Sequence, residues 1–333
     1  MLRPAAGPPY RMSAGRLPDR APLRLRSPLP AGPSAPRDVT CTEEMADATV
    51  ATFAVPHFTL LLRVRRIGGV PVLSARSLFQ EILDRDESYR LFCSIAAGGE
   101  AQGGWENGRI AVLIPESLRE LAPKAARHGA DEDKHGRLFT ALLRKRGLDL
   151  VPVPEATDYT VLLERRGIGL AHDKLRRDEP LTEQDVVTYL AHSRVTEQRA
   201  AEQMDLLKKH FGDHPDIGRA VLMIAQDEEN HLAYCHEELL RLAARGHGPA
   251  IRRTLRDTAR VEIEVYRDVS LAVLDHMGRI LGWPRPKSAL LAAGIRAVYV
   301  YERLAGRRRM VSLRLPERRD ALGGPAAPAP GTV

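Results

Sequence analysis

Residues 131–135 are Asp-Glu-Asp-Lys-His, and residues 227–231 are Asp-Glu-Glu-Asn-His. In both segments a glutamate stands three residues before a histidine. On an α-helix, positions i and i+3 project from the same face about one turn apart, so the carboxylate and the imidazole can bind one ion. A single pair of this kind is more simply interpreted as a surface ion pair. Its repetition, each time with an aspartate before the glutamate, favours a metal site.

A further glutamate precedes each pair at nearly the same distance. Glu100 lies 32 residues before Glu132, and Glu197 lies 31 residues before Glu228. The order along the chain is therefore Glu, Glu-x-x-His, Glu, Glu-x-x-His. Four antiparallel helices could direct these side chains inward, one glutamate from two helices and a Glu-x-x-His pair from the other two. Six such ligands suit two metal ions, and four carboxylates would be costly to bury without cations.

This order and spacing resemble the ferritin-like di-iron carboxylate proteins, which include bacterioferritins, rubrerythrins and bacterial di-iron oxygenases. The resemblance covers residues 75–247. It implies an all-α fold based on a four-helix bundle, with a long crossover between the second and third helices. It also implies a di-iron centre with Glu132 and Glu228 as bridging carboxylates, and the implied ligands are Glu100, Glu132, His135, Glu197, Glu228 and His231. Carboxylate and imidazole ligation suits iron, with manganese or a mixed manganese and iron pair as the alternative.

Residues next to the ligands have supporting roles in the proteins that this pattern resembles. In the oxygenases, the aspartate before the glutamate commonly orients a histidine of the opposite half, which implies this role for Asp131 and Asp227. Some di-iron N-oxygenases carry a third histidine four residues before the glutamate, which makes His128 a candidate seventh ligand. The matching position of the other half is Ile224. Because Gly129 follows, the alternative is a histidine at the surface or behind the ligands.

Small residues share the helical face of both upstream glutamates. Positions −4, +3 and +4 relative to Glu100 and Glu197 are Ala96, Gly103, Gly104, Ser193, Ala200 and Ala201. These residues predict the wall of a substrate pocket beside the metals, or a close approach of neighbouring helices. Each glycine inside a helix costs about 1 kcal/mol relative to alanine. Since Gly98 and Gly99 also precede Glu100, a helix broken near Gly98 is the alternative.

Caps and turn residues divide the rest of the chain. Ser74 and Thr182, the latter with Asp185, are expected helix caps, and residues 57–74 are expected to be extended. The expected helices span 86–114, 123–146, 182–211, 216–245, 250–281 and 286–305, with a crossover at 148–180. Residues 250–305 would thus add two helices packed on the bundle or on a partner subunit of a homodimer. Glu262, Glu264 and Tyr266 of the fifth helix could approach the site, although the ordinary chemistry of an amphipathic helix is the simpler interpretation.

Composition limits the class of protein. Hydrophobic residues make up 44% of the chain and aromatic residues 5%, which favours helices over sheets. The net charge of +7 comes largely from the termini, so a solubilising surface is favoured over nucleic-acid binding. Pro- and Arg-rich residues 1–45 and Pro- and Ala-rich residues 312–333 are expected to be disordered. Three cysteines without C-x-x-C spacing, and no apolar run long enough for a bilayer, favour the cytoplasm without a membrane anchor.

The function that this reasoning favours is an oxidase or oxygenase that uses O2 and acts on a small organic substrate. Electrons would come from a separate donor, because the chain carries no ferredoxin, flavin or rubredoxin-like motif. The first alternative is a ferroxidase or a peroxide-handling metal protein. The ligand order also resembles a tRNA hydroxylase family, which would use the basic charge. The last alternative is a helical interaction protein with a vestigial metal site.

Overall fold

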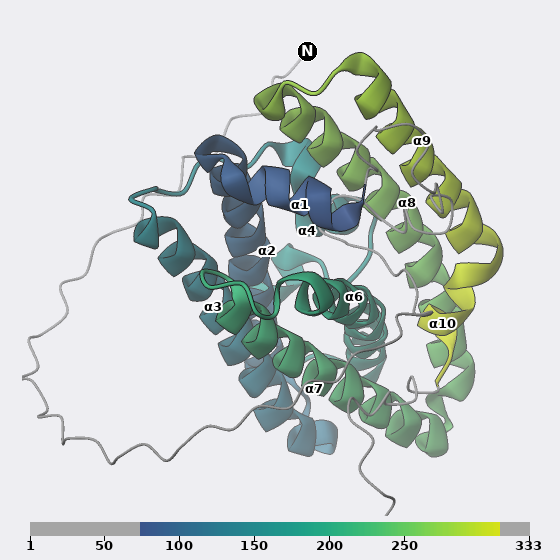
Figure 1. Ribbon diagram of the computed structural model, residues 1–333. Helices are drawn as coiled ribbons and strands as arrows, with labels where there is room; N and C mark the ends of the chain where they lie inside the picture. Colours follow the sequence, from purple (N-terminus) through teal and green to yellow (C-terminus); the bar gives the residue numbers. More distant parts are fainter. Residues whose placement is uncertain (1–73, 314–333) are drawn as a thin grey trace, which may run out of the picture. The chain divides into compact units, whose positions relative to one another are not determined.

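The computed structural model describes residues 74–313, and every regular element in this range is helical (Figure 1). The all-α class expected from the sequence is therefore confirmed. The expected extension at 1–45, the extended run up to residue 73, and the tail from residue 314 lie outside the described residues. None of the helices within 74–313 combines the length and apolar character needed to cross a membrane.

The first two helices begin as the sequence predicts. Helix α1 (Ala75–Asp84) is capped by Ser74, whose hydroxyl accepts a hydrogen bond from the Ser77 amide at 3.1 Å. Helix α2 (Asp86–Leu113) then runs without interruption through the glycines around Glu100. The alternative of a helix broken near Gly98 is therefore wrong.

Helix α3 (Ala122–Lys145) follows a 3₁₀ turn and packs along α2. Glycines make this contact close. A Cβ atom on Gly129 would lie 2.9 Å from the Gly104 carbonyl oxygen and from the Gly108 amide nitrogen, and one on Gly104 would collide with the Asp133 carboxylate. Gly104 therefore lies at the contact between the helices, and the prediction that it forms a pocket wall is wrong.

The connection from α3 to α6 is partly helical. It contains a 3₁₀ turn at Glu155–Thr157, helix α4 (Tyr159–Arg165) and helix α5 (His172–Leu175). These short elements pack against α2 and α8, and the Leu181 amide donates to the Leu113 carbonyl oxygen at 2.7 Å. The sequence predicted the position of this connection but not its helices.

Helices α6 (Glu183–Phe211) and α7 (Gly218–Leu242) pack along each other. The predicted capping box is confirmed: the Asp185 amide donates to the Thr182 hydroxyl at 3.2 Å, and the Thr182 amide donates to the Asp185 carboxylate at 2.9 Å. Helix α7 is shorter than expected at both ends. It gives way to a π-type turn at Ala243–His247, where Gly246 has a positive φ of 102°.

The last helices extend this arrangement. Helix α8 (Gly248–Leu281) packs against α6, and α9 (Arg285–Tyr301) lies along α8 (Figure 1). A second π-type turn leads into α10 (Arg307–Val311), which also contacts α8. The two helices expected after residue 250 are thus present, although the second ends at Tyr301 rather than at residue 305.

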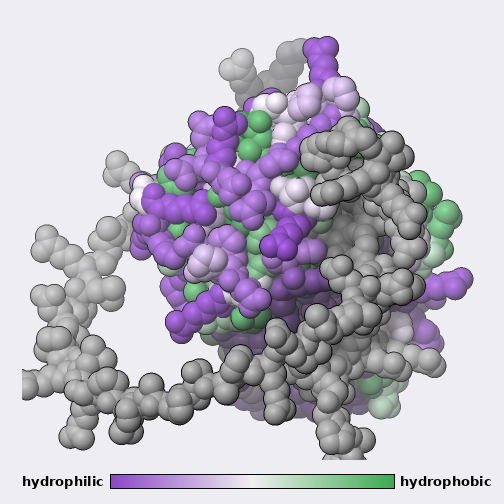
Figure 2. All heavy atoms as spheres, viewed as in Figure 1, coloured by the Kyte–Doolittle hydropathy of each residue, from purple (hydrophilic) through white to green (hydrophobic). Residues whose placement is uncertain are grey.

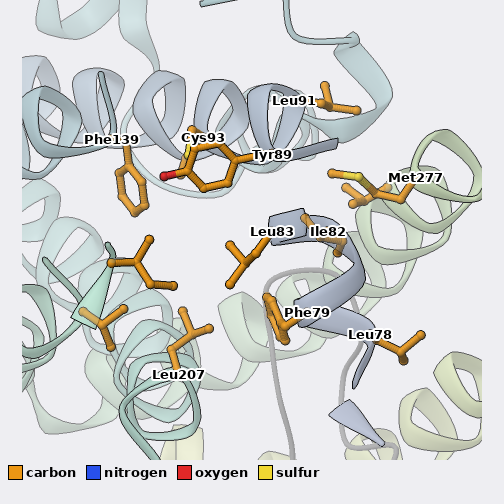
Figure 3. Close-up of a cluster of buried hydrophobic side chains, with 14 of the residues drawn as sticks. Leu78, Phe79, Ile82, Leu83, Tyr89, Leu91, Cys93, Phe139, Leu207 and Met277 are labelled. Atoms are coloured by element: carbon orange, nitrogen blue, oxygen red, sulfur yellow. The ribbon is translucent and has the colours of Figure 1, made fainter. Parts of the chain in front are cut away.

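Two clusters of buried apolar side chains hold the helices together. Figure 3 shows part of one cluster, in which α1 side chains point toward those of α2, α3, α6 and α8; the labelled residues are Leu78, Phe79, Ile82, Leu83, Tyr89, Leu91, Cys93, Phe139, Leu207 and Met277. Cys93 and Cys235 are fully buried. Figure 2 shows mainly hydrophilic residues on the visible described surface. Apolar burial therefore fixes the four helices that carry the predicted ligands.

Candidate metal centre

Four helices direct the predicted ligands to one buried cluster. Helix α2 contributes one glutamate, α6 another, and α3 and α7 a Glu-x-x-His pair each. The structure contains two groups whose potential ligand atoms all lie within 4.8 Å of one another. The first group is Glu100, Glu132, His135 and Glu228, and the second is His128, Glu132, Glu197 and His231. Glu132 belongs to both, so the groups adjoin and could hold metal at two neighbouring positions.

Most distances between imidazole and carboxylate atoms suit ligands of a common ion, and the longest, 3.9 Å, lies just beyond the range for such ligands. His135 Nδ1 lies 3.3 Å from Glu100 Oε2 and 3.6 Å from Glu228 Oε1. His231 Nδ1 lies 3.5 Å from Glu132 Oε1 and 3.9 Å from Glu228 Oε2. Two atoms that bind one ion at about 2.1 Å, at angles of 90–120°, are about 3.0–3.6 Å apart. Most of these separations are too long for good hydrogen bonds.

Buried polar atoms without partners support the same interpretation. Among the described residues, Glu228 Oε2 and both ring nitrogens of His231 are buried and accept or donate no hydrogen bond. Leaving such groups unsatisfied costs about 1–3 kcal/mol each. A cation between the carboxylates and the His231 ring would satisfy Glu228 Oε2 and His231 Nδ1. The residues present therefore fit a metal ion.

The carboxylates differ in their proton affinity. Burial raises the pKa of Glu100 to about 7 and that of Glu132 to about 8, and it raises the pKa of Glu228 well above its usual range. Burial also acts to raise the pKa of Glu197, but the adjacent His128 outweighs it and holds this pKa well below its usual range. Without metal, protons on the carboxyl groups with raised pKa values thus neutralise part of the negative charge of the cluster. Bound metal ions would neutralise that charge in their place.

Two aspartates and a lysine lie behind the histidines. His135 Nε2 lies 3.0 Å from Asp227 Oδ2, and His231 Nε2 lies 3.5 Å from Asp131 Oδ2. Each aspartate thus meets the histidine of the other Glu-x-x-His pair. Lys134 joins the two, because its Nζ donates to Asp131 at 2.8 Å and to Asp227 at 2.6 Å. Sequence reasoning missed Lys134, although its place directly before His135 was a signal.

His128 lies inside the cluster. Its side chain is 1% exposed, and its Nε2 lies 3.0 Å from Glu132 Oε1 and 3.3 Å from Glu197 Oε1. Its ring stacks on that of His231, with centroids 3.9 Å apart. The interpretation as a surface histidine is therefore wrong. Gly129 does not disturb the turn; it lets α2 approach, while the matching Ile224 of α7 packs in the apolar core.

His128 must be neutral to bind a metal, and a chain of hydrogen bonds then fixes the place of its remaining proton. Its Nδ1 lies 2.7 Å from the Tyr234 hydroxyl, which lies 2.7 Å from the Tyr189 hydroxyl. Tyr189 donates to Asn107 Oδ1 at 2.8 Å, and Asn107 Nδ2 donates to the Gly103 carbonyl oxygen at 3.1 Å. Each hydroxyl has one proton, and Tyr189 uses its proton for Asn107, so Tyr189 must accept a hydrogen bond from Tyr234. Tyr234 in turn accepts a hydrogen bond from the Nδ1–H group of His128.

It follows that the Nε2 lone pair of a neutral His128 faces the carboxylates, as a metal ligand requires. Sequence reasoning missed both tyrosines. Tyr234 was detectable, because it stands three residues after His231 on the same helical face. Tyr189 and Asn107 were not, since Tyr189 meets Tyr234, and Asn107 meets Tyr189, only in the folded arrangement of α2, α6 and α7.

A cavity of about 240 Å³ adjoins the cluster. It is lined by both upstream glutamates and by four of the predicted wall residues, namely Ala96, Gly103, Ser193 and Ala200. Ala201 lies away from it, which corrects that prediction. The connection before α6 contributes Thr157–Thr160, Leu163 and Leu170, and α8 contributes Tyr266, Val269, Ser270 and Val273. These remote segments complete the cavity lining, and local sequence spacing could not indicate them.

A buried ion-pair network borders the cavity. Arg199 donates through Nε and Nη2 to the two oxygens of Glu262, both at 2.9 Å, and its guanidinium lies 4.1 Å from the Tyr266 ring centroid. Glu262 is fully buried, and Tyr266 lines the cavity, so Tyr266 does approach the site. Glu264 instead pairs with Arg303 at the surface.

The arrangement as a whole places two candidate metal positions at the wall of a mostly apolar cavity. Such a site can bind metal in mixed nitrogen and oxygen ligation and hold a small molecule against it. The metal assignment rests on these residues alone, because comparisons with family models, curated proteins and solved structures give no match.

Proposed function

We propose that this chain is a di-iron carboxylate oxidoreductase of the ferritin-like superfamily, which uses O2 to oxidise or hydroxylate a small organic substrate. Helices α2, α3, α6 and α7 would be its four-helix bundle, and the connection after α3 its long crossover. The observation that carries the proposal is the cavity of about 240 Å³ whose wall includes carboxylates of both ligand groups.

The residues divide naturally between two metal positions. Glu100 and His135 would hold one ion, and the other ion would be held by Glu197, His231 and His128. Glu132 belongs to both groups, and Glu228 lies within 3.9 Å of both histidines of the Glu-x-x-His pairs, so these two would bridge. When bound, two iron ions supply the electrons and the coordination positions for reaction with O2. Manganese, or one ion of each, fits the same donor set.

The protein residues would orient the ligands and exclude water. Asp227 fixes the His135 ring through its Nε2 atom, Asp131 lies 3.5 Å from His231 Nε2, and Lys134 holds both carboxylates in place. The crossover and α8 supply part of the cavity wall, so they would contact a bound molecule on those sides. Each supporting contact of this type typically changes metal affinity or activity by about 10–100-fold.

The cavity favours an organic substrate over the alternatives. A ferroxidase needs a route for ions but no apolar chamber beside its metals, and the lining here includes Ile95, Leu163, Val269 and Val273. A tRNA hydroxylase would have to admit a nucleotide, which is larger than the molecule of about ten non-hydrogen atoms that this volume suits. Electrons would come from a separate donor protein.

The proposal is tested by anaerobic loading with Fe(II), followed by measurement of bound iron and of O2 uptake. We expect about two irons per chain and O2 consumption by the loaded protein. Glu132→Ala, which removes the shared ligand, should abolish both. Glu237→Ala, at an exposed position of the same site-bearing bundle, should change neither. Full-length protein that stays iron-free, or a Glu132→Ala variant with full iron occupancy, would refute the assignment.

A further inference from the structure

We infer that the cavity beside the candidate metal centre binds a neutral, mostly apolar molecule of about ten non-hydrogen atoms with one hydroxyl-like group that meets His192. As a statement about a substrate, this inference rests on the proposed function. As a statement about binding, it rests on the cavity alone and can be tested without iron chemistry.

The volume sets the size of the molecule. An apolar protein cavity of about 150 Å³ accommodates benzene, which has six non-hydrogen atoms. In proportion, the cavity of about 240 Å³ accommodates about ten such atoms. This corresponds to one six-membered ring with short substituents, or to a branched chain of similar bulk.

Apolar side chains from three segments set the character of most of the surface. They come from α2, from the crossover and from α8, and they are Ile95, Ile110, Leu163, Leu170, Val269 and Val273. A polar ligand would lose its hydration at these walls without gaining hydrogen bonds in return. The body of the ligand is therefore expected to be hydrocarbon.

The charges around the cavity disfavour an anion. Among the described residues that line it, Arg199 is the one arginine or lysine, and both oxygens of Glu262 bind its guanidinium. Its remaining Nη1 donates to Glu302 at 3.4 Å, and its face lies on the Tyr266 ring. An anionic ligand would thus gain no free cationic side chain and would lie near the glutamates of the metal cluster.

His192 supplies the polar contact. It lies on α6, lines the cavity, and has a buried Nε2 with no hydrogen-bond partner among the described residues. Burial lowers the pKa of His192, which keeps the ring neutral. The ring is held against Gly169, where a Cβ atom would lie 2.8 Å from Nδ1 and where φ is 83°. A hydroxyl suits this nitrogen in either tautomer, since it can both donate and accept.

The test uses three probes that share one ring and differ in one substituent: 4-methylphenol, 1,4-dimethylbenzene and 4-methylbenzoate. Their dissociation constants are measured by calorimetry or ligand-observed NMR on the full-length protein. We expect 4-methylphenol to bind about three- to tenfold more tightly than 1,4-dimethylbenzene, the usual effect of one hydrogen bond. We expect no detectable binding of 4-methylbenzoate.

Two variants locate the contact. His192→Ala should remove the preference for the phenol while 1,4-dimethylbenzene still binds, and Ala200→Leu should weaken both by filling the cavity. His276→Ala, at a half-buried position of α8 outside the cavity lining, is the control and should behave as the parent. Circular dichroism checks that each variant is folded.

The inference is overturned if 4-methylbenzoate binds as tightly as 4-methylphenol, if the preference survives in His192→Ala, or if no probe binds. These outcomes are separate from those of the iron experiment. Iron loading with O2 uptake but no neutral-probe binding would retain the proposed function and reject this substrate class. Probe binding without iron loading would retain the inferred class of ligand and reject the proposed function.

Discussion

At the scale of single residues, the candidate centre depends on groups that stand behind the ligands. Asp227 binds the outer nitrogen of His135, Asp131 stands 3.5 Å from that of His231, and the Tyr234 hydroxyl binds the outer nitrogen of His128. The contact of Tyr234 differs because its acceptor is a neutral hydroxyl. This hydroxyl accepts a hydrogen bond from His128 Nδ1 and donates its own proton in a hydrogen bond to Tyr189. His128 can thus be a neutral ligand without an aspartate beside it.

Replacement of Tyr234 by phenylalanine tests this role. The change leaves the Nδ1 proton of His128 without its acceptor, so the ring loses its preferred tautomer and orientation. We expect metal affinity to fall about 10-fold or more. Titration with Mn(II), followed by electron paramagnetic resonance, measures both the affinity and the number of coordinated histidine nitrogens. Tyr301→Phe, at an exposed position, is the control.

An unchanged affinity in Tyr234→Phe, with three histidine nitrogens still coupled to the metal, would show that the hydroxyl chain does not position His128. Loss of affinity without loss of a nitrogen would assign the effect to general destabilisation instead.

At the scale of helices, glycines set the distance between α2 and α3. Gly129 faces backbone atoms of Gly104 and Gly108, which cannot move as a flexible side chain would. The two helices supply Glu100, Glu132 and His135, so their separation also sets the geometry of the first ligand group.

We therefore expect Gly129→Ala to destabilise the fold by about 1–3 kcal/mol through overpacking, and to reduce metal occupancy. Gly108→Ala is a matched control on α2, because nothing lies within 4 Å of its added Cβ atom. Gly108→Ala should leave the free energy of unfolding unchanged or raise it by up to about 1 kcal/mol. Urea unfolding followed by circular dichroism compares them, and equal stability of the two variants would contradict the close-contact interpretation.

The buried pair of Arg199 and Glu262 joins α6 to α8 beside the cavity. Removing one partner leaves an uncompensated buried charge, so Arg199→Met should cost about 3–5 kcal/mol of unfolding free energy. The double variant Arg199→Met with Glu262→Met should recover most of this loss, since apolar side chains of similar size can replace a buried pair. Urea denaturation measures both, and a double variant no more stable than the single one would contradict the pairing argument.

At the scale of the whole molecule, metal binding and folding are coupled, because α2, α3, α6 and α7 must be assembled before their ligands converge. Mn(II) at about 100 times its dissociation constant should stabilise the folded protein by about 2.7 kcal/mol for each bound ion, or about 5 kcal/mol for two ions that bind alike. Thermal unfolding with Mn(II), compared with unfolding after chelation, measures the effect. Glu132→Ala should show no such increase, and a parent protein indifferent to Mn(II) would contradict the coupling.

Much of this molecule was predictable from local sequence. The Ser74 and Thr182 caps, the helix-forming periodicity and the paired Glu-x-x-His segments depend on neighbours within a few residues, so helix positions and the residues of the cluster could be inferred. For Gly104, the sequence left a pocket wall and a close helix approach both open, because the helical face of Glu100 does not show that Asp133 of another helix packs there. The crossover and α8 residues that line the cavity could not be inferred, since they lie far from the ligands along the chain.

The central claim is that two metal ions lie side by side in this cluster. Crystals of the full-length protein loaded anaerobically with Fe(II) would test it most directly through anomalous scattering at the iron edge. The account predicts two anomalous peaks, one beside Glu100 and His135 and the other beside Glu197, His231 and His128, with Glu132 at both. No peak in the cluster, or a single fully occupied peak there, would contradict it.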